Sequence, residues 1–385
     1  MHTSRPISRR IGFAMILALV ALTLSACSEP QTIGIAAVVG NHSNSATADL
    51  SNVSAQVEAA LADGTIAAVV RNDGYPQAVF ERTYGEPAST PVRDRDELRG
   101  AFAVDFASSL SLTTAQTPES LPLEAIAVAS RAIAAADLRT VQVYDSMLQT
   151  GGAMPLQDGR LYYEPSDIVE HLIGSGQMPD LSGVVVEIHG LGMVAAPQIA
   201  LDEASRSQLV RLWTAVLTAA GASSVRIIES VPGAPPAAGL PPVTPVQINS
   251  PTPIDPQAMS CESTDISNST LGFAGDSAIF LDEQGARATL GLVADMLLGC
   301  RGQITVTGGT SSAGTLEGRL AVATARAQAV ASILAELLTI PVNSITAIGA
   351  GTDFLGFVPD RDADGVLDEL LAQLNRKVIV SVVGA

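Results

Sequence analysis

Short apolar runs alternate with longer amphipathic stretches between residues 33 and 230. The first run, Ile33 to Val39, is continuously apolar, which is typical of a strand buried on both faces of a sheet. Further strands are expected at residues 65–71, 77–83, 140–145, 183–189 and 224–230. Helices are expected at residues 48–62, 94–109, 123–136, 166–173 and 203–220. This alternation predicts an α/β domain at residues 33–230, with a mostly parallel sheet and helices on both faces.

Proline becomes frequent after this domain. Residues 231–260 contain nine prolines: Pro232, Pro235, Pro236, Pro241, Pro242, Pro245, Pro251, Pro253 and Pro256. Chains of this composition are extended and semi-rigid. We therefore expect a linker here, and with it a domain boundary.

The alternation of runs resumes in residues 261–385. Strands are expected at residues 271–273, 303–308, 345–349 and 377–383, and helices at residues 282–298, 315–338 and 366–374. A helix is thus expected between the last two strands. We expect a smaller domain of the α+β class.

The first residues carry an export pattern. Arg5, Arg9 and Arg10 precede a 14-residue apolar run, which is shorter than the roughly 20 residues that a membrane-spanning helix needs. The sequence Leu24-Ser25-Ala26-Cys27 resembles a bacterial lipobox. The resemblance implies a signal peptide at residues 1–26, a Cys27 that is acylated (for example with palmitate), and a lipidated tether at residues 27–32. The alternatives are a soluble secreted protein and an uncleaved anchor.

Charge and cysteine content indicate which partners and which cellular location to expect. The chain has 39 acidic and 21 basic side chains, a net charge of -18, which disfavours nucleic acid as a partner. Besides Cys27 it has only Cys261 and Cys300, and outside the cytoplasm such a pair favours one disulfide over two separate thiols. We expect a protein of the cell membrane or outer envelope, outside the cytoplasm.

Four features in residues 261–385 resemble the OmpA-like, peptidoglycan-associated domain. They are Phe273 with Ser277, Ala278 and Leu281; the segment from Gly308 to Gly314; Arg326-Ala327; and Asn375-Arg376-Lys377-Val378. In that family, an Asp and an Arg hold the diaminopimelate of a peptidoglycan stem peptide. The resemblance implies a peptidoglycan-binding site formed by Thr310, Ser311, Arg326, Asn375 and Arg376.

This chain departs from the family at two positions. Ser311 stands where the family has the Asp, and Gly309 stands where it has a His. A hydroxyl group accepts a hydrogen bond from an ammonium group but supplies no charge, so ligand binding is expected to be weaker. Arg326 either binds the ligand carboxylate or is a structural residue at a strand–helix junction.

A second motif predicts a cation site. Asp360, Asp362, Asp364 and Asp368 occupy positions 1, 3, 5 and 9 of a calcium-loop pattern, with Gly365 at position 6. Leu371 stands where the pattern requires a bidentate Glu. The motif is either a calcium site or a solvated acidic turn.

The first domain is Rossmann-like or resembles a von Willebrand A-type fold. Asn41, Ser43 and Ser45 follow the first strand, where that family has the metal-binding sequence D-x-S-x-S. Asp145 stands at the end of a later strand, where that family often has another acid, and Thr117 lies in a loop between. Asn in place of the leading Asp removes one charge from any Mg²⁺ site, and a turn that caps the next helix explains the same residues.

No motif of a catalytic nucleophile or phosphate-binding loop is present in the sequence, so we do not expect an enzyme. The first hypothesis is a lipid-anchored protein that tethers a membrane to peptidoglycan through its OmpA-like domain. The second is a binding or scaffold module, in which the first domain recruits an unknown protein or ligand and peptidoglycan binding is weak or absent.

Overall fold

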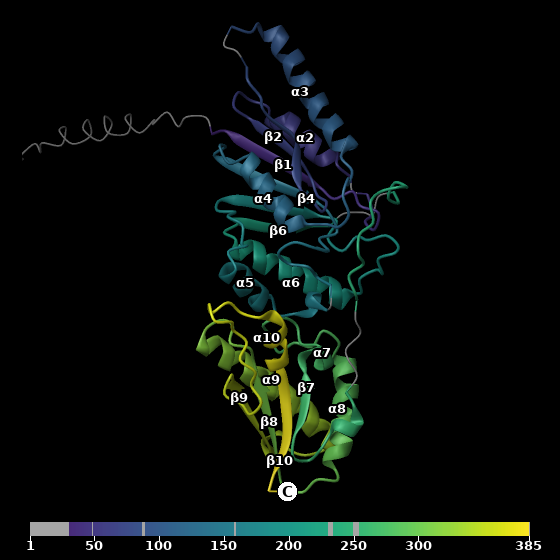
Figure 1. Cartoon of the computed structure of the whole chain (residues 1–385), viewed down its shortest axis with the longest axis vertical. Coiled ribbons are helices and arrows are strands. Elements are labelled where there is room, and N and C mark those ends of the chain that lie inside the picture. Colours follow the sequence, from purple (N-terminus) through teal and green to yellow (C-terminus); the bar gives the residue numbers. More distant parts are fainter. Residues whose placement is uncertain are drawn as a thin grey trace, which may run out of the picture.

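The computed structural model describes residues 31–47, 49–86, 89–157, 159–229, 234–248 and 254–384. Two sheets, each with its own helices, lie one above the other along the long axis of the molecule (Figure 1). Cys27 and the expected signal peptide lie outside the described residues.

The first sheet has six strands in the order β3-β2-β1-β4-β5-β6. All neighbours are parallel except β2 and β3, so the mostly parallel sheet expected from the apolar runs is confirmed. Its strands are β1 (Ile33–Val39), β2 (Ile66–Arg71), β3 (Gln77–Thr83), β4 (Leu138–Tyr144), β5 (Val184–His189) and β6 (Ser224–Ile228).

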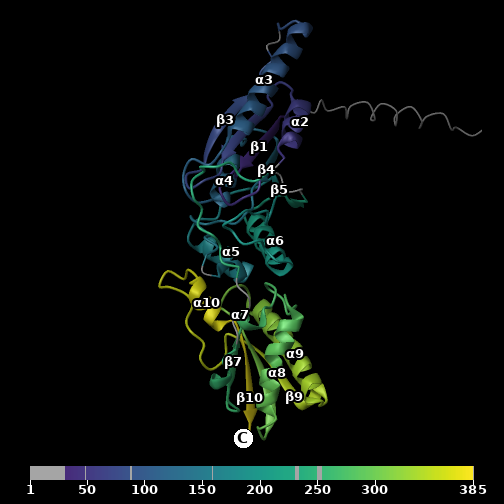
Figure 2. The same cartoon turned by 90° about the vertical axis from the view of Figure 1, so that its right-hand side faces the viewer.

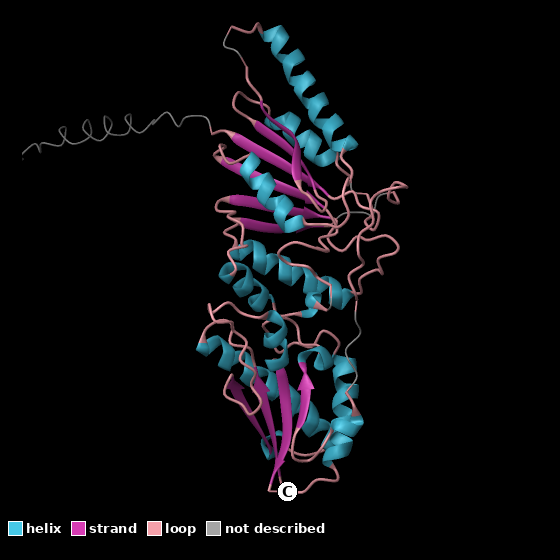
Figure 3. Cartoon of the chain, viewed as in Figure 1, coloured by secondary structure: helices cyan, strands magenta, loops and turns pink. Residues whose placement is uncertain are grey.

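Helices cover both faces of this sheet (Figure 3). They are α2 (Ser51–Ala60), α3 (Val92–Leu112), α4 (Pro122–Ala132), α5 (Pro165–Gly174) and α6 (Glu203–Ala219). α2 and α3 pack in one apolar cluster, whereas α4, α5 and α6 share the other, which contains the fully buried Trp213. α5 packs beside α6, and both lie between the six-stranded sheet and the C-terminal unit (Figures 1 and 2).

The proline-rich segment is not a free spacer. Ala234 O accepts hydrogen bonds from Thr47 N (3.1 Å) and Thr47 Oγ1 (2.8 Å). Val246 is buried, and its backbone exchanges two hydrogen bonds with the Gln198 side chain. Residues 234–248 therefore form a strap on the first unit, and apolar packing changes from the first core to the second between Ile248 and Ile254.

The second sheet has four strands in the order β7-β10-β8-β9, with β8 and β9 parallel and β10 antiparallel to both of its neighbours. The strands are β7 (Thr264–Ser267), β8 (Gln303–Gly309), β9 (Ile345–Gly351) and β10 (Lys377–Val383), and the helices are α7 (Asn268–Leu271), α8 (Glu283–Leu297), α9 (Leu316–Leu338) and α10 (Glu369–Asn375). α9 is long and apolar enough to cross a membrane, but Ala327, Val330 and Leu334 bury it in the core of this unit.

Two expectations for this unit were wrong in detail. The strand expected at residues 271–273 is instead the end of α7, which the Ser267 hydroxyl caps and Gly272 (φ 66°) terminates. α10 begins at Glu369 rather than at Val366, because the Asp368 carboxylate caps it by accepting from Leu370 N and Leu371 N. Side-chain capping sets both boundaries, and the spacing of apolar residues does not predict where a helix is capped.

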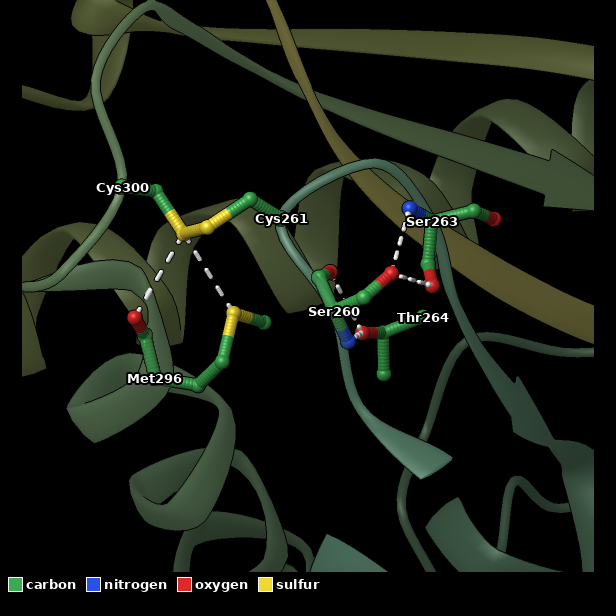
Figure 4. Close-up of a disulfide and its surroundings, with 6 residues drawn as sticks. All are labelled: Ser260, Cys261, Ser263, Thr264, Met296 and Cys300. Carbon is green, nitrogen blue, oxygen red and sulfur yellow. Dashed lines mark hydrogen bonds between the residues drawn. A yellow bond between two sulfur atoms is a disulfide. The ribbon is translucent and has the colours of Figure 1, made fainter. Parts of the chain in front are cut away.

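A disulfide joins Cys261 to Cys300, as expected from the cysteine count (Figure 4). It connects the segment before β7 to the end of α8, and Cys261 O also accepts a hydrogen bond from Val382 N of β10 (2.8 Å). The cross-link therefore holds one end of the sheet to the helix that covers it.

Candidate functional site

The loop after β8 places Thr310 and Ser311 at the upper end of the second sheet. Both are buried, and Thr310 N donates to Gly351 O of β9 (2.8 Å). A Cβ atom at Gly309 would lie 2.8 Å from the Phe354 ring and 2.9 Å from Asn375 O. The packing here has no room for the family's His at position 309.

Arg326, on α9, is almost fully buried and contacts the segment that follows α7. Its Nε donates to Ser277 O (2.7 Å), and its guanidinium lies over the Phe273 ring at 5.1 Å from the centroid. Its Nη2 donates to Glu164 Oε1 in a buried ion pair. Arg326 thus binds a carboxylate, and that carboxylate comes from the first unit.

Arg376, at the start of β10, binds a second carboxylate. Its Nε donates to Asp167 Oδ2 (2.6 Å) and its Nη2 to Asp167 Oδ1, which is the bidentate arrangement that a guanidinium offers. Ser311 Oγ donates to Asp167 Oδ1 (2.9 Å) and accepts from Arg376 Nη2 (3.0 Å). The structure therefore brings Ser311, Arg326 and Arg376 together around two acidic side chains.

Both acids belong to α5 or to the residue that precedes it, and sequence analysis missed them. Glu164 and Asp167 are fully buried. Burial raises the pKa of the Glu164 carboxyl, but Arg326 and Arg376 outweigh it, and the pKa lies below its ordinary value. Burial opposes the charge of Arg376, but Asp167 and Glu164 raise the pKa of its guanidinium above its ordinary value. The pKa of the Asp167 carboxyl, by contrast, is raised, because burial outweighs its contacts with Arg376 and Ser311.

A cavity of about 230 Å³ adjoins this cluster at the junction of the two units. Its lining includes Ser166 and Asp276 together with Thr310, Arg319 and Arg376. Thr310 Oγ1 is buried and has no hydrogen-bond partner among the described residues. The side of the cluster next to α9 is therefore less tightly packed than the arginine pairs themselves.

Asn375, the remaining expected site residue, has a local role. Its side chain accepts from Val358 N (2.8 Å) and donates to Val358 O (2.7 Å) and Asp360 Oδ2 (3.1 Å). Asn375 is fully buried. It fixes the loop before α10 and does not reach the two acids of α5.

The structure does not bring the four acids of the calcium pattern to one point. Asp360 is buried and accepts from Ser312 N (2.9 Å), Asp362 accepts from Asp364 N and Val366 N (both 2.9 Å), and Asp368 caps α10. Within the described ranges, no group of three His, Cys, Asp or Glu side chains is placed to hold a metal ion. Asp360 and Asp362 accept backbone hydrogen bonds and Asp368 caps a helix, so calcium binding by Asp360, Asp362, Asp364 and Asp368 stays a prediction.

The expected cluster in the first unit lies at the carboxyl ends of β1 and β4, where the strand order reverses and α/β folds bind ligands. Asp145 accepts from Met147 N (2.6 Å) and Asn72 Nδ2 (3.0 Å) and lies 3.2 Å from His42 Nε2. Ser45 Oγ donates to Gly40 O (3.0 Å). Met147 N and Asn72 Nδ2 thus hold the Asp145 carboxylate, and the part of this unit that the structure describes places no group of three His, Cys, Asp or Glu side chains to hold a metal ion.

Other segments of the chain contact the remaining residues of that motif. Ser43 Oγ donates to Pro241 O of the strap (3.0 Å), and Ala115 N donates to Asn41 O (3.1 Å). Thr117 N donates to Asp73 Oδ2 (3.1 Å) rather than joining Asp145. The structure thus holds Asn41, Ser43 and Ser45 by separate partners, and of these three only Ser45 is buried.

Searches of protein-family models and of curated proteins find no match to the chain. Similar solved structures include the cell wall anchor of the T6SS from Pseudomonas aeruginosa, at 27% identity over 31% of this chain and 79% of that chain (TM-score 0.25). The OmpA-like domain of FopA1 from Francisella tularensis is 21% identical over 31% and 70% (TM-score 0.23). The peptidoglycan-associated lipoprotein from Burkholderia pseudomallei is 25% identical over 30% and 87% (TM-score 0.21). These partial similarities do not establish a family for the whole chain.

Proposed function

We propose that the chain is a lipid-anchored protein of the cell envelope that attaches a membrane to peptidoglycan through residues 261–385. In this proposal Cys27 carries the lipid, and Arg326 and Arg376 hold the free carboxylate of a stem peptide. We assign the chain no enzymatic activity.

The observation that supports this proposal is the pair of buried guanidiniums. Arg326 and Arg376 both bind carboxylates through charge-assisted hydrogen bonds, and Arg376 does so with two nitrogens. Such a site suits a ligand with a free carboxylate, because a guanidinium matches its geometry and a neutral amide would leave a buried charge without a partner. The residues that resemble the family motif therefore have the chemistry that the family ligand requires.

A second function is favoured by one observation. The acids that occupy this site belong to the same chain, and Ser311 supplies no charge for a ligand ammonium group. In this alternative the C-terminal unit binds peptidoglycan weakly or not at all, and the first unit recruits a protein or ligand at the envelope.

Co-sedimentation of the full chain with purified sacculi distinguishes the two functions. A soluble stem peptide with a free diaminopimelate carboxylate should compete, and a peptide amidated there should compete at least about tenfold less well, since a hydrogen bond to a charged group contributes about 1.5–3 kcal/mol. Equal competition by both peptides would exclude carboxylate recognition, and no retention at all would favour the alternative.

Anchoring is tested separately. Cys27→Ser is expected to release the protein from membranes, because the thiol is the acyl acceptor and several acyl chains are needed for stable attachment. Fractionation of cells and labelling with a fatty-acid analogue measure this. Equal labelling of the variant and the parent would contradict the assignment of Cys27.

A further inference from the structure

We propose that Glu164 and Asp167 act as an internal ligand: they occupy the arginine site of the C-terminal unit, and a stem peptide binds only after α5 has moved away. This inference rests on the proposed function, and it adds a closed state in which the chain blocks its own site.

Glu164 and an external carboxylate cannot use Arg326 at the same time. The Arg326 side chain is 3% exposed and the Glu164 side chain is 0% exposed. Glu164 also accepts from Asp276 N and lies 3.6 Å from Arg376 Nη1, so one carboxylate contacts both arginines. With α5 in place, a peptide carboxylate has no approach to Arg326.

Asp167 contacts Ser311, the position at which this chain lacks the Asp of the family. Ser311 Oγ lies 2.9 Å from Asp167 Oδ1 and donates to it. A carboxylate at position 311 would face the Asp167 carboxylate at hydrogen-bond distance, and two like charges in a buried site repel strongly. Serine allows α5 to close over the loop, whereas the family's Asp would oppose closure.

The contacts around this cluster are also polar. Glu170 accepts from Gly314 N (2.8 Å) and pairs with Arg361, and His171 Nδ1 lies within hydrogen-bond distance of Leu367 O (2.9 Å). The apolar cores of the two units are separate, and a cavity remains at the junction. A junction of this kind resembles the interfaces between domains that move, because water can replace its polar partners.

The test is sacculus retention of the full chain with Glu164→Gln and Asp167→Asn. Both changes keep the shape of the side chain and remove the charge, so the closed state is weakened while Arg326, Arg376 and Ser311 are unchanged. We expect retention to increase at least about tenfold, and small-angle X-ray scattering to show a larger radius of gyration. A matched control is Glu58→Gln with Glu203→Gln, two exposed acids of the first unit, which should change neither quantity.

A measurement on the unmodified chain avoids any doubt about folding. Addition of a diaminopimelate-containing tripeptide should increase hydrogen exchange at the backbone N–H groups of α5, while those of β4 and β5 stay protected. A peptide that binds without changing exchange in α5 would overturn the inference and leave the proposed function intact.

The remaining outcomes separate the two proposals. If the acid variant is retained no better than its parent, and competition by the free stem peptide still occurs, the function stands and the internal ligand is refuted. If neither the parent nor the acid variant is retained on sacculi, both proposals are refuted, even if scattering shows that the variant has opened.

Discussion

In a chain that already carries Glu164→Gln and Asp167→Asn, the further substitution Arg326→Lys is expected to weaken retention on sacculi by about 10- to 100-fold. Lysine keeps the charge but loses the planar fork of donors, and a hydrogen bond to a charged group contributes about 1.5–3 kcal/mol. Each 1.4 kcal/mol corresponds to about tenfold in affinity. Dissociation constants from co-sedimentation titrations measure the change.

The same substitution in the parent chain is expected to have a smaller effect. Arg326 binds Glu164 in the closed state, so Arg326→Lys weakens both the internal contact and the contact with the ligand, and the two losses partly cancel. Arg287→Lys is the matched control, because Arg287 pairs with Glu336 on the exposed surface of the same unit and should leave retention unchanged. Equal losses in the two backgrounds would contradict competition between Glu164 and the ligand.

Replacing Cys261 and Cys300 with Ser is expected to lower the free energy of unfolding of the C-terminal unit by about 4 kcal/mol. The bond closes a loop whose ends are 39 residues apart, and cross-linking a loop of that length reduces the conformational entropy of the unfolded chain by about this amount. The segment before β7 would then be held mainly by Val382 N–H donating to Cys261 O and by the pairing of β7 with β10.

Urea denaturation followed by hydrogen exchange in β7, β8 and β10 measures this loss in the C-terminal unit alone. The parent chain treated with a reducing agent is the control, and it should be destabilised as much as the double variant. Both samples should keep the stability of the first unit, since its described residues contain no cysteine. A loss below 1 kcal/mol in either sample would refute the structural role of the disulfide.

The central strands of the first sheet could be predicted from the sequence because they are buried on both faces, unlike the edge strands β3 and β6. A strand such as β1 is continuously apolar, and parallel strands must be connected by helices, so strand and helix positions follow from composition alone. Strand ends and helix caps were less predictable. Ser267 and Asp368 set two boundaries through one or two capping hydrogen bonds each, which leave no periodic pattern.

Only the C-terminal half of the candidate site could be predicted from the sequence. The positions of Ser311, Arg326 and Arg376 follow from their resemblance to a family motif, but their partners are 144, 162 and 209 residues away in the sequence. Glu164 and Asp167 lie at the start of a helix whose sequence pattern is ordinary, and only the docking of the two units shows what they contact. The departures at Ser311 and Gly309 were the available indications that the site differs from that of the family.

The strap limits how far the two units can separate. Its last described residue, Ile248, packs on the first core, and Ile254 packs on the second. Six residues of fully extended chain span at most about 20 Å. If α5 leaves the arginine site, its acids therefore remain at an effective concentration on the order of millimolar. A single soluble muropeptide at micromolar concentration would be outcompeted by them, whereas the closely spaced stem peptides of an intact wall would not. The shortness of this connection would thus make the protein bind assembled wall readily, whereas soluble fragments would compete only at concentrations that approach the millimolar range.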